Sequence, residues 1–344
     1  MKFLKFPLLL LAVTPLFFTS CDDEGDVDDP ISIREVDAFT STNTDGEILT
    51  FDFSDLDDDP NVTNKRNTVA YADADGIYYN DFKDLLIQVS RTDNKVYVYE
   101  DFKDAEAGAA VTPDFESEEG LFSNARGITF GRDRIIVAQD GNDANNNVNK
   151  LVVFNLDDKR PVLRNTFTVD INLWGIFYDD NDLYVISDNT SDVAIYKDFF
   201  DNETDGDLTP TMTVTIEGLV RTHGLTFSDA DDELMILTDV GDAASDSDGQ
   251  VIFIRDFDDK SEAAGDGGTI ALADQIVIRG EGTFLGNPVD VDYDQLTERI
   301  FVSERKTDGG RLLVFDRPET SGNPAPIYNT TVPGISSLAL DLGL

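Results

Sequence analysis

Four residues of different chemical type stand directly before glycines at nearly regular intervals along the chain. They are Asp75, Arg126, Trp174 and His223, and the glycines that follow them are spaced by 51, 48 and 49 residues. A carboxylate, a guanidinium, an indole and an imidazole at one place could contact a small polar or aromatic ligand, because pockets combine an apolar wall with a few convergent polar groups. Such a site requires a repeated structural element that brings the four together.

His223 is the only histidine and Cys21 the only cysteine in the chain. One cysteine excludes an intrachain disulfide framework and a zinc site built on several thiolates, and one histidine excludes metal sites with several histidines. No serine-nucleophile motif accompanies His223. Two interpretations of His223 stay open, a satisfied structural residue or a ligand contact, and no catalytic residue is assigned.

The glycine positions belong to a repeat. Each glycine begins a short apolar strand, which a polar turn connects to a second apolar strand ending in Ser, Asp or a similar residue. A variable loop and a third strand follow. In two looser copies Asp290 and Ser337 replace the glycine. The set of candidate ligand-binding residues is therefore completed by Val289 or Asp290 in the first of these copies and by Ser336 in the second. Periods of about 40–50 residues with several short strands each are typical of a β-propeller. A fourth strand can be assigned between the copies.

The two ends of the repeat region complement each other. The chain ends after an inner strand, "SSLALD" at 336–341, whereas residues 36–71 supply three strands but no inner one. We therefore predict an all-β fold: a six-bladed β-propeller of four-stranded antiparallel blades over residues 34–344, closed by the C-terminal inner strand and the N-terminal outer strands. A pair of β-sandwiches is the alternative.

Several segments resemble a known repeat class. "GLTFSDADDELMILTD" at 224–239 resembles an NHL-type repeat, and the segments 201–218 and 319–334 resemble the linker and fourth strand of its bacterial members. Lactonases of the SMP-30-like class share this propeller form, and the resemblance implies a central Ca²⁺ held by oxygen ligands at the channel mouth. Here Arg126, Trp174 and His223 stand between Asp75 and Asp290, which favours a binding or scaffold domain over the alternative, a Ca²⁺-dependent lactonase-like hydrolase.

Acidic residues also recur where the second strands end, at Asp140, Asp188, Asp239 and Glu304. Carboxylates in such places either accept hydrogen bonds from turn amides or bind Ca²⁺ along the rim, and both interpretations stay open. The turn "DNETDGD" at 201–207 alternates oxygen-bearing residues as a calcium loop does. Met212 occupies the position of the closing Glu, so the EF-hand pattern fails and a solvated turn is the competing interpretation.

The N-terminus has the order of a secretory signal, with Lys2 and Lys5, an apolar run and small residues before Cys21. "FTSC" at 18–21 resembles a bacterial lipoprotein signal box, which implies lipidation of Cys21. The acidic residues that follow resemble a tether to the outer cell surface. We expect a lipoprotein signal peptide at 1–21, an acidic linker at 22–33, and an outer-membrane lipoprotein exposed on a Gram-negative cell. An ordinary signal peptide with an incidental cysteine is the alternative.

The formal net charge of −43 limits the partners. Nucleic acids and anionic lipid headgroups both require a basic surface, so neither is expected as a ligand. An acidic coat on an extracellular protein and adaptation to high salt would both explain the charge. We expect a monomer that contacts the membrane through its lipid anchor and binds an unidentified protein, glycan or small molecule.

Overall fold

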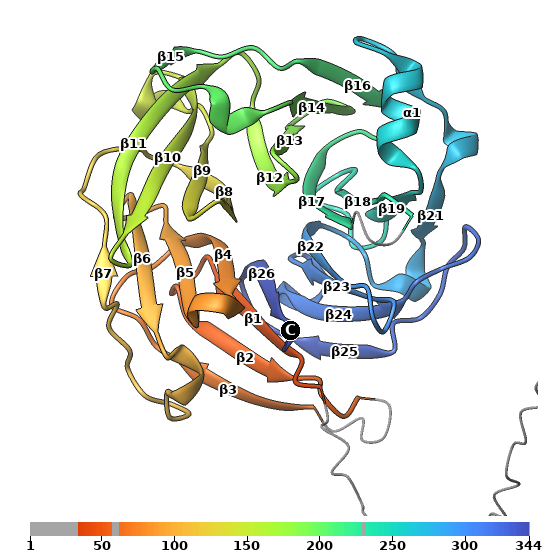
Figure 1. Ribbon diagram of the computed structural model, residues 1–344. Coiled ribbons are helices and arrows are strands. Elements are labelled where there is room, and N and C mark those ends of the chain that lie inside the picture. The colour runs from red at the N-terminus through yellow and green to blue at the C-terminus, as the bar shows by residue number, and fades with distance from the viewer. Residues whose placement is uncertain (1–33, 57–61, 229–231, 344) are drawn as a thin grey trace, which may run out of the picture. The chain divides into compact units, whose positions relative to one another are not determined.

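Six β-sheets stand around a central channel, as the view along the channel shows (Figure 1). The computed structural model describes residues 34–56, 62–228 and 232–343, and the unit that these residues form begins at Arg34. This confirms the predicted six-bladed β-propeller. The signal peptide, Cys21 and the linker predicted at 1–33 lie outside the described residues.

Three of the blades contain the N-terminal part of the chain. Blade 1 has the spatial order β26 (Ile335–Asp341), β1 (Asp37–Thr42), β2 (Ile48–Asp52) and β3 (Thr63–Asn67). Blade 2 consists of β4 (Ala74–Asn80), β5 (Leu85–Ser90), β6 (Lys95–Glu100) and β7 (Phe115–Glu116). Blade 3 consists of β8 (Ala125–Gly131), β9 (Arg134–Gln139), β10 (Asn149–Asp157) and β11 (Arg160–Val169).

The other three blades follow in chain order. Blade 4 consists of β12 (Leu173–Asp179), β13 (Asp182–Ser187), β14 (Asp192–Tyr196) and β16 (Met212–Ile216). Blade 5 consists of β17 (Thr222–Ser228), β18 (Leu234–Asp239), β19 (Gln250–Ile254) and β21 (Ile276–Arg279). Blade 6 consists of β22 (Pro288–Asp294), β23 (Arg299–Glu304), β24 (Arg311–Asp316) and β25 (Tyr328–Thr331).

Short helices lie in the connections. They are α1 (Phe257–Ala264), η1 (Asp81–Lys83), η2 (Phe102–Asp104), η3 (Asp143–Asn145), η4 (Phe199–Asp201), η5 (Leu272–Asp274), η6 (Glu281–Thr283) and η7 (Thr307–Gly309). No helix among the described residues has the length and apolar character needed to span a membrane.

The ring closes as the sequence predicted. β26 pairs antiparallel with β1, with Phe39 opposite Ala339 and Thr40 opposite Leu338. The innermost strand of blade 1 therefore comes from the C-terminus and its three outer strands from the N-terminal region. A sheet that shares strands from both ends holds the first and last blades together through backbone hydrogen bonds.

Two sheets contain a fifth strand that the sequence did not predict. β15 (Gly206–Asp207) pairs parallel with β11, and β20 (Thr269–Ile270) pairs parallel with β16. In blades 1 and 5 a single parallel bridge stands in place of a fifth strand. These bridges join Thr68 to Ala110 and Ile278 to Gly322. In all four cases the connection before a fourth strand reaches back to the outer edge of the preceding blade, which covers backbone groups that would otherwise form an open edge.

The turn at 201–207 is one of these connections. Asp205 accepts hydrogen bonds from the Asn165 amide and from the Thr166 backbone, both on β11. The Asp205 carboxylate therefore attaches this connection to blade 3.

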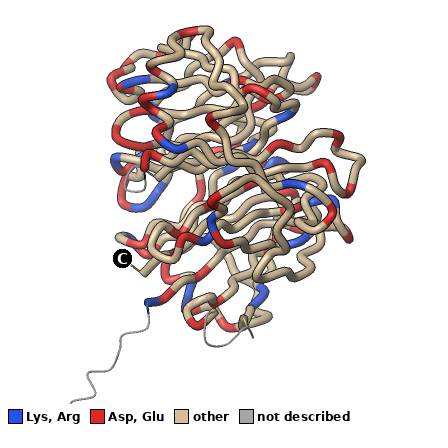
Figure 2. The backbone as a smooth tube through the Cα atoms, turned by 90° about the vertical axis from the view of Figure 1, so that its right-hand side faces the viewer, with Lys and Arg blue, Asp and Glu red and all other residues tan. Residues whose placement is uncertain are grey.

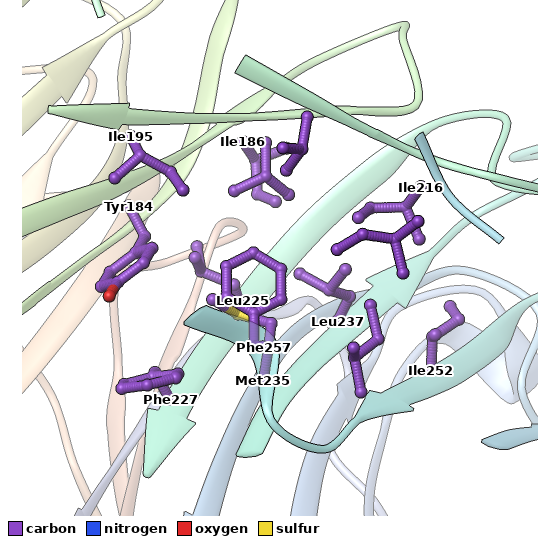
Figure 3. Packing of buried hydrophobic residues seen from close by; sticks show 14 of the residues in the cluster. Tyr184, Ile186, Ile195, Ile216, Leu225, Phe227, Met235, Leu237, Ile252 and Phe257 are labelled. Carbon is purple, nitrogen blue, oxygen red and sulfur yellow. The ribbon is translucent and has the colours of Figure 1, made fainter. Parts of the chain in front are cut away.

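The hydrophobic core lies between neighbouring blades. Between blades 4 and 5, Tyr184 and Ile186 face Leu225, Met235 and Leu237 (Figure 3). Every residue of β18 is buried, because blades cover both of its faces. Positions of Asp and Glu are spread along the backbone throughout the domain (Figure 2), and the whole chain has 69 Asp and Glu against 26 Lys and Arg.

The inner strands approach one another closely at one level of the channel. A Cβ atom on Gly175 would lie 2.4 Å from the His223 backbone oxygen, and one on Gly127 would lie 2.7 Å from the Trp174 backbone oxygen. Only glycine fits such a contact without moving the backbone, because contacts under 3.0 Å overlap van der Waals surfaces. This explains the regular glycines of the repeat.

Candidate functional site

The sequence-predicted ligand residues converge at one end of the channel. Asp75, Arg126, Trp174 and His223 are each the second residue of an inner strand, and in the ring of blades they follow one another. We call the end of the channel where the six inner strands begin the top mouth. The repeat places these side chains together because it gives each inner strand the same start relative to the channel.

The four residues form a continuous arc of contacts. The Arg126 guanidinium lies 3.3 Å from the Asp75 carboxylate and 4.4 Å from the centre of the Trp174 ring. The Trp174 and His223 rings stack at 3.7 Å with an angle of 7° between their planes. Cation–π and ring-stacking contacts of this kind each stabilise by about 0.5–2 kcal/mol. The arc therefore connects blades 2 to 5 at the top mouth.

His223 is buried, with 2% of its surface exposed. Its Nε2 lies 3.5 Å from Asp188 Oδ1, at the limit of hydrogen bonding, and Nδ1 has no hydrogen-bond partner among the described residues. Burial lowers the pKa of His223, so the ring is neutral at pH 7. A neutral, stacked imidazole supports the Trp174 ring rather than acting as a charged contact.

Asp188 also has a cationic neighbour, Arg221, which the sequence did not predict. Arg221 Nε lies 3.3 Å from Asp188 Oδ1, and the Arg221 guanidinium lies 5.7 Å from the centre of the Trp174 ring. Burial opposes ionisation of Asp188, but the close contact with His223 and the hydrogen bond and positive charge of Arg221 outweigh burial and lower its pKa. Asp188 is therefore an ionised carboxylate that holds Arg221 over the aromatic stack.

Of the remaining two positions, Ser336 lies at the predicted level, and the choice left open between Val289 and Asp290 falls on Val289. By register, Pro288 pairs with Glu304, so Val289 is the second residue of β22 and Asp290 takes the place of the glycine, one residue deeper in the channel. Asp290 lies at the wall of a narrow cavity, and burial raises its pKa to about 8. Ser336 is the second residue of β26 and donates its hydroxyl to Ala74 O at 2.5 Å. Neither Asp290 nor Ser336 extends the arc.

The four acids at the ends of the second strands divide into two pairs. Asp140 and Asp188 lie one residue beyond their strands, and Asp140 faces Arg126 Nε at 3.7 Å. Asp239 and Glu304 are instead the last residues of β18 and β23. The sequence did not show this shift of one position, since both pairs follow a similar apolar run.

Asp239 and Glu304 accept backbone hydrogen bonds. Asp239 accepts from the Val220 and Arg221 amides, and Glu304 accepts from four backbone amides in the segments 286–287 and 306–307. This geometry matches the turn-binding interpretation of these two acids. Within the described ranges, no three His, Cys, Asp or Glu side chains converge in a way that could hold a metal ion. Calcium at the rim stays a prediction.

Two further arginines lie at the top mouth and were not predicted. Arg91 bonds both Asp73 and Asp75, at 2.8 and 3.0 Å. Burial, with Arg91 and Arg126 nearby, lowers the pKa of Arg305 despite the opposing charge of Asp75. The sequence carries a usable signal, because Arg91 and Arg305 directly follow second strands, the position that Asp140 and Asp188 hold in blades 3 and 4.

The channel below the top mouth is narrow. Its upper cavity has a volume of about 80 Å³. Its lining includes residues at the glycine positions, such as Gly127 and Asp290, and residues two positions further along the inner strands, such as Thr129 and Asp292. Typical small-molecule pockets measure roughly 300–1,000 Å³. A ligand of the top mouth therefore contacts the surface formed by Arg126, Arg221 and the surrounding loops rather than entering the channel from this end.

Known proteins support the fold. No protein-family profile and no curated protein sequence matches the chain. A chain from the crystal structure of a nidogen–laminin complex is similar over 90% of this chain and 99% of its own, with 12% identity and a TM-score of 0.58. The WD40 β-propeller domain of Doa1 is similar over 89% of this chain and 83% of its own, with 11% identity and a TM-score of 0.52. At these identities the likeness shows the propeller fold alone, and the NHL-type assignment stays a prediction.

Proposed function

We propose that this protein is a surface-anchored binding module whose top mouth holds a protein partner. The observation that carries the proposal is the arc from Asp75 through Arg126 and Trp174 to His223. Tryptophan and arginine dominate the binding energy of many protein interfaces, because they combine a large contact area with directed polar groups. Here the guanidiniums of Arg126 and Arg221 lie 4.4 and 5.7 Å from the centre of the Trp174 ring.

The exposed groups of the site are the arginines. The Arg126 and Arg221 side chains are 18% and 31% exposed, whereas Trp174 is 7% exposed and acts from beneath them. A guanidinium held in one orientation loses little entropy when it bonds a carboxylate, so an acidic side chain of the partner suits this surface. A propeller of the same fold was crystallised within the nidogen–laminin complex, which is consistent with a protein partner.

The place where the described chain enters the domain also suits use of the top mouth. Arg34 bonds Leu342 O and Asp294 at the opposite end of the channel, where β22 and β26 end. The described chain therefore begins at the end away from the top mouth. Expressing the Cys21→Ser variant tests the anchor: the wild type should incorporate labelled fatty acid and fractionate with membranes, and the variant should do neither.

The test of binding uses a matched pair of variants. Immobilised wild-type protein, Arg126→Ala/Arg221→Ala and Lys197→Ala are each exposed to secreted-protein, envelope and glycan fractions. Lys197 pairs with Glu262 far from the channel mouth and serves as the control. We expect one or more proteins to bind wild type and Lys197→Ala with affinity at least about tenfold above that for the double variant. Saturable binding of a glycan alone, or equal binding to all three, would contradict the proposal.

A further inference from the structure

A layer of side chains two residues below the glycine level divides the channel, and we call this layer the partition. Side chains on a strand alternate between faces, so the channel-facing residues two positions below the glycines form one layer. The layer consists of Tyr78, Thr129, Phe177, Thr226, Asp292 and Ala339, all of which line the upper cavity. Two aromatic rings and one carboxylate thus form the floor of the narrow upper cavity.

The same layer is the ceiling of a second and larger cavity. That cavity has a volume of about 400 Å³ and opens at the end of the channel where the inner strands finish; we call it the bottom pocket. Five of the six partition residues line it, and Asp179, Ser228 and Gln295 add polar groups at its wall. Leu340 and Leu342 form an apolar rim. Its volume lies within the usual range for small-molecule sites, unlike that of the upper cavity.

The charge of the bottom pocket has one sign. Among the described residues, its lining includes Asp179 and Asp292 and contains neither lysine nor arginine. Neighbouring acids on the same strand ends are neutralised, since Asp294 pairs with Arg34 and Asp341 pairs with Lys103. The net charge of −43 adds a long-range attraction for cations.

Asp292 differs from those neutralised acids. It accepts hydrogen bonds from the Tyr293 and Leu340 amides and from the Thr226 hydroxyl, but no ion pair joins it to a cationic side chain in the described part of the chain. Burial raises its pKa to about 6, so the carboxylate is ionised at pH 8. Its negative charge is therefore available to a ligand that reaches the ceiling of the pocket.

We propose that the bottom pocket binds a small organic ammonium ion, with the cationic nitrogen against the Tyr78 and Phe177 rings and Asp292, and its apolar body toward Leu340 and Leu342. Aromatic faces attract ammonium ions through the ring quadrupole, and a nearby carboxylate adds direct charge attraction. An anionic ligand would meet only like charges there. This site is independent of the top mouth, from which the partition layer separates it.

Isothermal titration calorimetry at pH 8 tests the inference with choline and its neutral isostere 3,3-dimethylbutan-1-ol. We expect choline to saturate one site, with a Kd on the order of 1 mM or tighter, and the isostere to bind at least about tenfold more weakly. The top-mouth variant Arg126→Ala/Arg221→Ala should bind choline as wild type does. Absence of saturable choline binding, or equal binding of the isostere, would overturn the proposal.

Three variants locate the bound cation. Asp292→Asn and Phe177→Leu should each weaken choline binding about tenfold, whereas Phe177→Tyr keeps a ring and should restore it. Asp290→Asn changes an equivalent carboxylate on the same strand but above the partition, and should leave the affinity unchanged. Far-UV circular dichroism of each variant verifies the fold. Equal losses for Asp290→Asn and Asp292→Asn would overturn the placement of the ligand in the bottom pocket.

Discussion

The wall of the channel is built in two ways at the same level. From β8 to β22, successive inner strands touch through Gly127, Gly175 and Gly224, with no room for a side chain. Between β4 and β8 the approach is less close, since a Cβ atom on Gly76 would lie 3.1 Å from the Ile128 side chain. From β22 through β26 to β4, side chains bridge the strands instead. Asp290 accepts from the Leu338 amide at 2.9 Å and Ser337 accepts from the Gly76 amide at 3.1 Å.

The difference lies where the two ends of the chain meet. Direct backbone contact requires each blade to sit in one exact place, whereas a carboxylate or hydroxyl bridge spans a wider separation by a directed hydrogen bond. The top mouth shows the consequence: the contact arc of planar side chains runs along the glycine side and stops at the bridged side. Close approach of backbones thus brings Arg126, Trp174 and His223 within stacking distance.

The largest expected effect comes from adding a methyl group on the glycine side. In Gly175→Ala the new Cβ overlaps the His223 backbone oxygen, which cannot rotate away, so the free energy of unfolding should fall by about 3 kcal/mol. Gly322→Ala is the matched control, because the nearest atom to its Cβ would be the Thr320 backbone oxygen at 4.0 Å, an ordinary contact. Denaturant unfolding measures both. Equal stability of the two variants would show that the inner strands can separate without loss.

The next effect concerns pH on the bridged side. Asp290 has a pKa of about 8 in the folded protein and an ordinary value near 3.8 when unfolded, so the folded state binds the proton more tightly. Its contribution to stability is fully present below pH 4 and is lost as pH rises toward 8. Between pH 6 and pH 8 the free energy of unfolding should therefore fall, by about 2 kcal/mol from this group.

The Asp290→Asn variant isolates that contribution from other acids. It should flatten the pH dependence by the same amount, as measured by denaturant unfolding of both proteins at each pH. Parallel curves for wild type and variant would mean that the folded carboxylate titrates normally and that the bridge does not depend on its protonation.

The smallest effect is expected for the hydroxyl bridge. Ser337→Ala leaves the Gly76 amide without its acceptor, which should lower the free energy of unfolding by about 1 kcal/mol. Ser247→Ala, in an exposed loop, should change it by less than about 0.5 kcal/mol. Thermal unfolding distinguishes the two, and a neutral Ser337→Ala would show that the bridge is dispensable.

The sequence predicted the fold and the arc because both follow from local signals. The recurring glycines, the buried runs such as 234–239 and the complementary ends determine the number of blades and the closure. Asp75, Arg126, Trp174 and His223 were identified by position alone. The edge strands β15 and β20 were not, since each has two residues and no periodicity.

The side-chain network was harder to predict for a physical reason. Arg91, Arg221 and Arg305 act across blades, and a single sequence does not indicate which loops meet. A shift of one residue separates Asp188, which holds Arg221, from Asp239, which caps a turn. The partition was readable in principle, because Tyr78 and Phe177 each lie two residues after a repeat glycine, and alternation then directs both rings into the channel.

The shared sheet of blade 1 has a consequence for the order of folding. β26 is synthesised after every other strand of the described ring, and it must pair with β1, almost 300 residues earlier. Until then β1 presents an unpaired edge and Asp290 has no Leu338 amide to bind. The blades formed earlier therefore make an open, aggregation-prone ring. Loss of β26 would therefore leave an incomplete ring with an open edge, rather than a slightly shorter propeller.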